Sequence, residues 1–185
     1  MSARAERVLD AAILVVGTEG MRALTHRAVD AAAGLPTGST SNLYRTRESL
    51  LRAMVGRMIE TEFEGWDRLA RTLRPTTTDE IVEALVQLIG MLTGPMRALS
   101  VARYSLFMEA ARDPALAGEI GRAADQVAAL TTEWLGRLGL RDPRSRTPIV
   151  MAYLDGLIVH RLAFPPESLP RDVAVELRTL LDGLR

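Results

Sequence analysis

Residues 37–42 bring together small side chains that donate and accept hydrogen bonds. The polar members of this segment are Thr37, Ser39, Ser41 and Asn42. Hydroxyl and amide groups of this size reach the edges of DNA bases without steric conflict, and an asparagine amide can form two hydrogen bonds with adenine. The chemistry that this segment offers is therefore base recognition.

Two short helices joined by a turn must present these side chains. Thr25 is a good N-cap for a first helix that ends at Gly34, and a second short helix is expected over residues 38–44. An α-helix fits the major groove of DNA, and in a helix-turn-helix the second helix lies there. Segment 25–44 therefore predicts a helix-turn-helix.

The rest of the chain also predicts helices. Apolar residues recur at helical spacing from one end to the other, and no stretch shows sustained two-residue alternation. Asp113 and Thr147 are expected to cap two of the later helices. The predicted fold class is all-α with nine helices, over residues 4–19, 25–34, 38–44, 48–74, 79–93, 95–112, 114–138, 148–164 and 170–184.

The composition excludes several function classes. Among 185 residues there are no cysteines and two histidines, which excludes thiolate zinc sites and leaves too few ligands for a histidine-built one. We therefore expect neither a metal nor a cofactor. No apolar run approaches the roughly 18–20 residues of a membrane span, and residues 1–10 lack the apolar core of a signal peptide. We expect no membrane partner and a cytoplasmic location.

Residues 4–52 are similar in order and spacing to the DNA-binding head of the tetracycline-repressor family. The matching stretches are Arg7 to Ala12, Gly20, Ala23 to Thr25, Ala33 to Leu35, Gly38 with Ser39, Tyr44, and Arg47 to Leu51. The resemblance implies a DNA-binding domain over residues 1–47 and a ligand-binding and dimerisation domain over residues 48–185, linked by the helix 48–74. It also implies a regulator, and not an enzyme: a repressor that a small molecule releases from double-stranded operator DNA.

The resemblance assigns roles to individual residues of the head. Thr25, Arg27 and Arg47 are expected to anchor phosphates. Tyr44 is expected chiefly to pack the recognition helix against the helix over residues 4–19, and a contact of its hydroxyl with a phosphate is the alternative. Asn42 is either a base contact or a polar residue at the end of its helix. The expected DNA-binding set is Thr25, Arg27, Thr37, Gly38, Ser39, Ser41, Asn42, Tyr44 and Arg47.

Three positions depart from the family pattern. Thr37 replaces a basic residue, Ser41 replaces an aromatic residue, and Thr40 stands at what is usually an aliphatic core position. These changes remove phosphate and stacking contacts, so the operator sequence cannot be taken from relatives.

The resemblance further implies a ligand cavity and a dimer interface in the body. Aromatic and thioether side chains suit a largely apolar effector; the candidates are Phe63, Trp66, Met91, Tyr104, Phe107, Met108, Trp134 and Tyr153. A two-fold dimer is expected because one recognition helix contacts too few base pairs for specificity. The interface candidates on the last two helices are Leu154, Gly156, Leu157, Val159, Leu177, Leu180, Leu181 and Leu184. Alternatively, these apolar stripes complete the core of a single chain.

Two other functions compete with the regulator hypothesis. The first is a helical partner-binding module whose helix-turn-helix no longer binds DNA, favoured only by the low basicity of residues 36–44. The second is a small helical hydrolase or isomerase using Asp155 or Glu109 with His160. Asp155 and His160 are five residues apart and do not share a helical face well, so the enzyme hypothesis is the weaker one.

Overall fold

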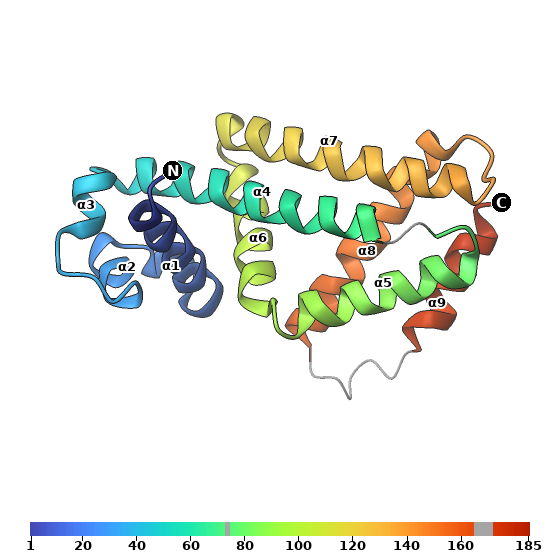
Figure 1. Cartoon of the computed structure of the whole chain (residues 1–185), viewed down its shortest axis with the longest axis horizontal. Helices are drawn as coiled ribbons and strands as arrows, with labels where there is room; N and C mark the ends of the chain where they lie inside the picture. The colour runs from blue at the N-terminus through green and yellow to red at the C-terminus, as the bar shows by residue number, and fades with distance from the viewer. Residues whose placement is uncertain (73–74, 165–171) are drawn as a thin grey trace. The chain divides into compact units, whose positions relative to one another are not determined.

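The structure is a computed structural model that describes residues 1–72, 75–164 and 172–185, with the side chains of all of these except residues 66–72. Within these ranges it contains nine α-helices and no strand, which confirms the all-α prediction (Figure 1). The elements are α1 (Ala3–Glu19), the 3-10 helix η1 (Met21–Ala23), α2 (His26–Ala32), α3 (Ser39–Leu43), α4 (Arg47–Thr72), α5 (Thr78–Thr93), α6 (Arg97–Ala110), α7 (Pro114–Arg137), α8 (Pro143–Ala163) and α9 (Val173–Gly183).

The chain forms two compact units. The first unit comprises residues 1–64 and 96–122, and the second comprises residues 65–95 and 123–185. The first unit extends beyond the expected head because α6 packs along α1. The functional division at residue 47 stays a prediction.

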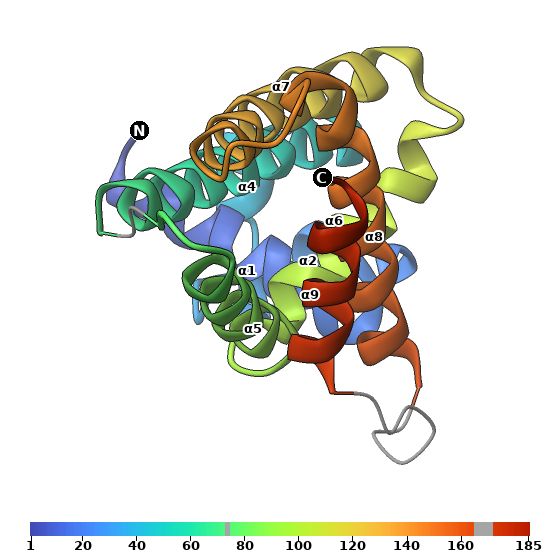
Figure 2. The same ribbon diagram turned by 90° about the vertical axis from the view of Figure 1, so that its right-hand side faces the viewer.

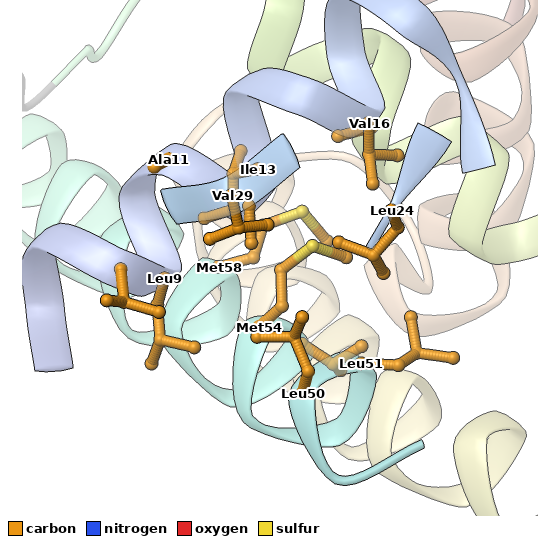
Figure 3. Close-up of a cluster of buried hydrophobic side chains, with 14 of the residues drawn as sticks. Leu9, Ala11, Ile13, Val16, Leu24, Val29, Leu50, Leu51, Met54 and Met58 are labelled. Atoms are coloured by element: carbon orange, nitrogen blue, oxygen red, sulfur yellow. The ribbon is translucent and has the colours of Figure 1, made fainter. Parts of the chain in front are cut away.

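The core of the first unit lies where α1, α2, α4 and α6 meet. Val8, Leu9 and Val16 of α1 are fully buried together with Leu50 and Met54 of α4 (Figure 3). The spacing of these residues places them on one face of each helix, as the sequence pattern predicts. The apolar face of α1 therefore holds the helix-turn-helix and the start of α4 in one body.

Gly17 allows α1 and α6 to approach each other at backbone distance. A Cβ atom built on Gly17 would lie 2.0 Å from the carbonyl oxygen of Ala98, far inside van der Waals contact. Only glycine fits this position without a shift of one helix.

The second unit contains α5, α8 and α9 (Figure 2). A capping box starts α5: Thr77 accepts a hydrogen bond from the Glu80 N–H, while the Glu80 carboxylate accepts from the Thr77 N–H. Asp172 caps α9, and the apolar stripe of α9 packs against α5. The predicted start of this last helix at residue 170 lies outside the described residues.

The start of α8 corrects one prediction. The helix α8 begins at Pro143, five residues before the predicted start at residue 148, and Pro143 is the proline at its N-terminus. Thr147 is consequently buried inside the helix. Its hydroxyl donates to the Pro143 carbonyl oxygen at 2.9 Å and shares a hydrogen bond with the Thr132 hydroxyl at 2.7 Å, so it does not cap. Within the described part of the chain, no single helix is long and apolar enough to span a bilayer.

Candidate nucleic-acid interface

The helix-turn-helix forms as the caps in the sequence predict. The Thr25 hydroxyl accepts a hydrogen bond from the Ala28 N–H at 3.2 Å and caps α2. Gly38 precedes α3 with a φ of 92°, in the left-handed region that favours glycine. It thus permits the turn that sets α3 beside α2.

The expected DNA-binding side chains differ in exposure. Five of them are exposed: Thr25, Arg27, Thr37, Asn42 and Arg47. The Asn42 side chain forms no hydrogen bond with any residue that the structure describes, and the same holds for Thr37. The exposed outer surface of α3 and its preceding turn therefore carries uncommitted hydrogen-bonding groups, which base recognition requires.

Ser39 corrects one of the expectations. Its side chain is buried, its hydroxyl donates to the Pro36 carbonyl oxygen at 2.5 Å, and it accepts from Nη2 of Arg4 at 2.8 Å. The side chain therefore faces the interior of the first unit, where it stabilises the turn, and it does not point to a base edge. Ser41 is half-buried, and its hydroxyl donates to the Gly38 carbonyl oxygen at 3.0 Å.

Tyr44 and His26 hold the end of α3. Tyr44 is half-buried against the core, as predicted, and burial raises the pKa of its phenol. Nε2 of His26 lies 2.6 Å from the Tyr44 carbonyl oxygen, so this half-buried ring forms a hydrogen bond with the backbone. Arg47, although exposed, donates through Nη2 to the Met21 carbonyl oxygen at 2.8 Å. One of its donors is thus already used to hold η1.

Arginines of the head divide into two groups. Arg4 and Arg7 support the turn: Nε of Arg7 donates to the Ala33 carbonyl oxygen at 2.8 Å. Arg22, Arg27 and Arg45 are exposed and have no partner among the described residues. These three are available to phosphates. The sequence argument missed Arg45, which follows Tyr44 directly.

Asp30 is a second residue that the sequence argument missed. Its side chain is 3% exposed, and its carboxylate accepts from the Gly38 N–H at 2.8 Å, the Thr40 N–H at 2.7 Å and the Thr40 hydroxyl at 2.6 Å. Burial alone would raise the pKa of this carboxyl, but the hydrogen bonds from Thr40 and Gly38 outweigh burial and hold it below the ordinary 3.8. The sequence signal that could have identified this contact is the presence of polar residues at two core positions, 30 and 40.

The expected ligand residues are distributed over both units. Phe63, Tyr104, Phe107 and Met108 belong to the first unit; Met91, Trp134 and Tyr153 belong to the second. The Trp66 side chain lies outside the described residues. Trp134 is buried, whereas Met91 and Met108 are exposed.

An aromatic pair with a cation and a carboxylate lies in the first unit. The rings of Tyr104 and Phe107 meet edge to face with their centroids 5.5 Å apart. The Arg103 guanidinium lies 5.6 Å and 5.3 Å from these two centroids, and its Nε is 3.8 Å from the Glu62 carboxylate. Both charged side chains are largely buried. The Arg103 guanidinium therefore already forms cation–π contacts with both rings.

A separate groove of about 270 Å³ lies on α8 and α9 of the second unit. Tyr153 lines this groove, and its hydroxyl donates to Glu176 at 2.9 Å. Two of the expected interface residues, Gly156 and Leu157, also line it. No group of three or more metal-ligating side chains occurs in the described ranges.

Four of the expected interface residues complete the core of a single chain. Leu157, Leu177, Leu181 and Leu184 are buried within the second unit, where the stripe on α9 packs against α5. For these four residues the structure supports the alternative that the apolar stripes complete the core of a single chain. Leu154 and Leu180 are half-buried, while Gly156 and Val159 are exposed on α8.

The fold and the exposed polar surface of α3 together define a helix-turn-helix protein with a helical body. A family model described as tetracyclin repressor-like, C-terminal domain, matches residues 76–184. The chain therefore belongs to the tetracycline-repressor family, whose members are transcriptional regulators that bind DNA, not enzymes.

Solved structures agree with this assignment. A TetR-family member from Streptomyces coelicolor A3 is 29% identical with a TM-score of 0.74, covering 99% of this chain and 98% of the other. The multidrug binding protein EbrR complexed with ethidium is 29% identical with a TM-score of 0.71 over the same shares of the two chains. A transcriptional regulator from Rhodococcus sp. Rha1 shares the fold at 16% identity, with a TM-score of 0.78 and coverage of 97% and 95%. No curated protein sequence matches this chain significantly.

Proposed function

We propose that this regulator is a cytoplasmic homodimeric repressor that binds operator DNA and dissociates from it when a small molecule binds. The observation that carries the proposal is the exposed surface of α3 and its turn. Thr37 and Asn42 are exposed there with no partner among the described residues, while the neighbouring Ser39 and Thr40 are fully used inside the head. Exposed polar side chains that form no hydrogen bond within the described protein are available to hydrogen-bond a polar partner such as DNA.

The phosphate contacts follow from the groups around α3. The Thr25 end of α2 offers free backbone amides, and Arg27 and Arg45 are exposed cations without a partner among the described residues. These groups would fix the register on the duplex, and Thr37, Ser41 and Asn42 would contact bases. A dimer would place two such helices about 34–36 Å apart, one turn of DNA.

Two exposed residues on α8 support the dimer. Gly156 has no side chain, and Val159 has an apolar one. Small residues let two helices approach closely, and exposed apolar side chains favour burial in an interface. The proposed interface is thus α8 rather than the whole leucine stripe.

The effector class is suggested by the cluster around Tyr104 and Phe107. EbrR is described in complexes with ethidium, proflavin and malachite green, which are aromatic cations; ethidium and proflavin contain flat fused rings. In this chain Arg103 already lies over two rings beside Glu62. We infer that the effector is a flat, largely apolar molecule that tolerates a positive charge.

A gel-shift series tests the proposed function. The purified chain is titrated onto duplexes that flank its own coding region at several salt concentrations, with and without ethidium. We expect a dimer-sized complex that weakens steeply with salt. A ligand that prefers the non-binding state by about 1.4 kcal/mol lowers DNA affinity about tenfold at saturation. A dimer that shifts no duplex would instead support a partner-binding module.

A further inference from the structure

The buried contact between Asp30 and Thr40 connects the two helices of the helix-turn-helix. One carboxylate accepts three hydrogen bonds of 2.6–2.8 Å, two from backbone N–H groups of Gly38 and Thr40 and one from the Thr40 hydroxyl. Hydrogen bonds to an ionised acceptor are roughly twice as strong as neutral ones. They also have preferred directions, so this carboxylate restricts the orientation of α3 as well as its distance from α2.

Within its own five residues α3 has no buried apolar side chain. Ser39 and Thr40 face the interior, and Leu43 is 40% exposed. A helix of this length is also too short to be stable alone. Apart from the packing of the following Tyr44, α3 is therefore held through polar contacts, of which the buried Asp30 carboxylate provides the largest number.

We propose that the Asp30–Thr40 pair is a positioning device that sets the angle at which Thr37, Ser41 and Asn42 meet base edges, and thereby sets base discrimination. This inference rests on the proposed DNA-binding function and adds the residue that controls its specificity. Neither Asp30 nor Thr40 touches a base. Both act by fixing the turn and helix that carry the base-contacting side chains.

The sign of the charge effect separates positioning from simple electrostatics. Removing a carboxylate from the DNA-binding head strengthens its attraction to any duplex, because a negative charge is lost. A positioning role predicts the opposite for the specific sequence. Its affinity falls because the contacts are misaligned, while affinity for unrelated DNA stays equal or rises.

The test compares Asp30→Asn with the matched control Asp10→Asn. Asp10 is an exposed carboxylate of the same unit that pairs with Arg57 at 2.8 Å and does not contact α3. A duplex is first enriched from a random-sequence pool by the wild-type protein. The affinities of each variant for this duplex and for a shuffled duplex are then measured. Amide hydrogen exchange by NMR is recorded at Gly38 and Thr40 in the free proteins.

For Asp30→Asn we expect exchange at Gly38 and Thr40 to accelerate about tenfold or more, and the ratio of the two affinities to fall by a similar factor. Asp10→Asn changes neither quantity. If Asp30→Asn does not fold, Thr40→Val, which removes only the hydroxyl donor, shows the same changes to a smaller extent. Thr40→Ser, which keeps that donor, retains the wild-type ratio.

Two results would overturn the inference. An unchanged affinity ratio in both Asp30→Asn and Thr40→Val, with the wild-type protein selecting a duplex, removes the positioning role alone. If the wild-type protein selects no duplex at all, both the proposed function and this inference fail. Thermal melts of each variant confirm that the comparison is made between folded proteins.

Discussion

The two units of this protein hold their functional surfaces in different ways. In the first unit α3 is held by a hydrogen bond that Arg4 donates to Ser39 and by two that Thr40 donates to the Asp30 carboxylate, with little apolar contact of its own. In the second unit α9 is held by a stripe of buried leucines against α5. Hydrogen bonds depend on direction, whereas apolar burial depends mainly on area.

This difference matches the different needs of a helix that contacts DNA and of a helical body. A helix that contacts bases needs a fixed angle, because base-edge hydrogen bonds require aligned partners. A body that responds to a ligand needs helices that can shift without losing specific bonds. The following substitutions change one unit at a time and thereby test the contrast.

The largest expected effect is in the apolar core of the second unit. Leu177→Ala removes a fully buried side chain from the contact of α9 with α5. We expect the free energy of unfolding to fall by about 2–5 kcal/mol, measured by urea denaturation. Val175→Ala, at a position 58% exposed on the same helix, is the control and should change it by less than about 0.5 kcal/mol. Equal effects would show that the α9 stripe is not core.

The backbone contact of α1 with α6 in the first unit gives the next largest effect. Gly17→Ala places a methyl group against the Ala98 carbonyl and should cost about 1–3 kcal/mol. Gly56→Ala on α4 meets no atom within 4 Å and should stabilise by about 0.5–1 kcal/mol. Thermal melts of the two variants should therefore shift in opposite directions. A stabilising Gly17→Ala would contradict the close approach.

Acid should selectively loosen the polar contacts of α3. The folded-state pKa of Asp30 lies below its ordinary 3.8. The ionised carboxylate therefore stabilises the folded protein above pH 3.8, and this stabilisation is lost as pH falls through the folded-state pKa. Asp30→Asn should cost about 1.5–3 kcal/mol at pH 7. Denaturation series from pH 7 to pH 2 should show this difference shrinking below pH 3.8. A difference that grew in acid would mean that the folded protein prefers the protonated carboxyl.

The smallest expected effect separates stability from DNA binding. Thr25 caps α2 in the first unit and Thr77 caps α5 in the second, each by one hydrogen bond of 3.2 Å. Replacing either by alanine should cost about 1 kcal/mol. Only Thr25→Ala should weaken DNA binding, since only Thr25 lies beside the proposed phosphate contacts. Melting and gel-shift titrations of both variants make the comparison. Equal loss of binding would assign the effect to stability.

Local signals in the sequence predicted most of the helices. Gly20 ends α1 and Thr25 caps α2, because caps and left-handed glycines act within a few residues of themselves. The start of α8 was predicted five residues late because two prolines, Pro143 and Pro148, both fit a helix start. A local rule cannot choose between two equivalent signals.

The candidate site was less predictable than the helices. Small polar residues in 37–42 indicated base recognition, but which of them face outward depends on partners distant in sequence. Ser39 is turned inward by Arg4, 35 residues away, and Thr40 by Asp30. Likewise, the apolar pattern identified the buried face of α9 but not that α5 covers it. The spacing of apolar residues identifies which face of a helix is buried, but it does not identify the element that covers this face.

The most direct measurement compares the affinities for two duplexes of a variant that lacks the proposed base-contacting side chains. Thr37, Ser41 and Asn42 are replaced together by alanine, and Gln87→Ala, an exposed position on α5, is the control. The triple variant should lose its preference for the duplex that the wild-type protein enriches and keep salt-dependent binding to shuffled DNA. Gln87→Ala should keep both. A triple variant that still prefers the enriched duplex would contradict base recognition by α3.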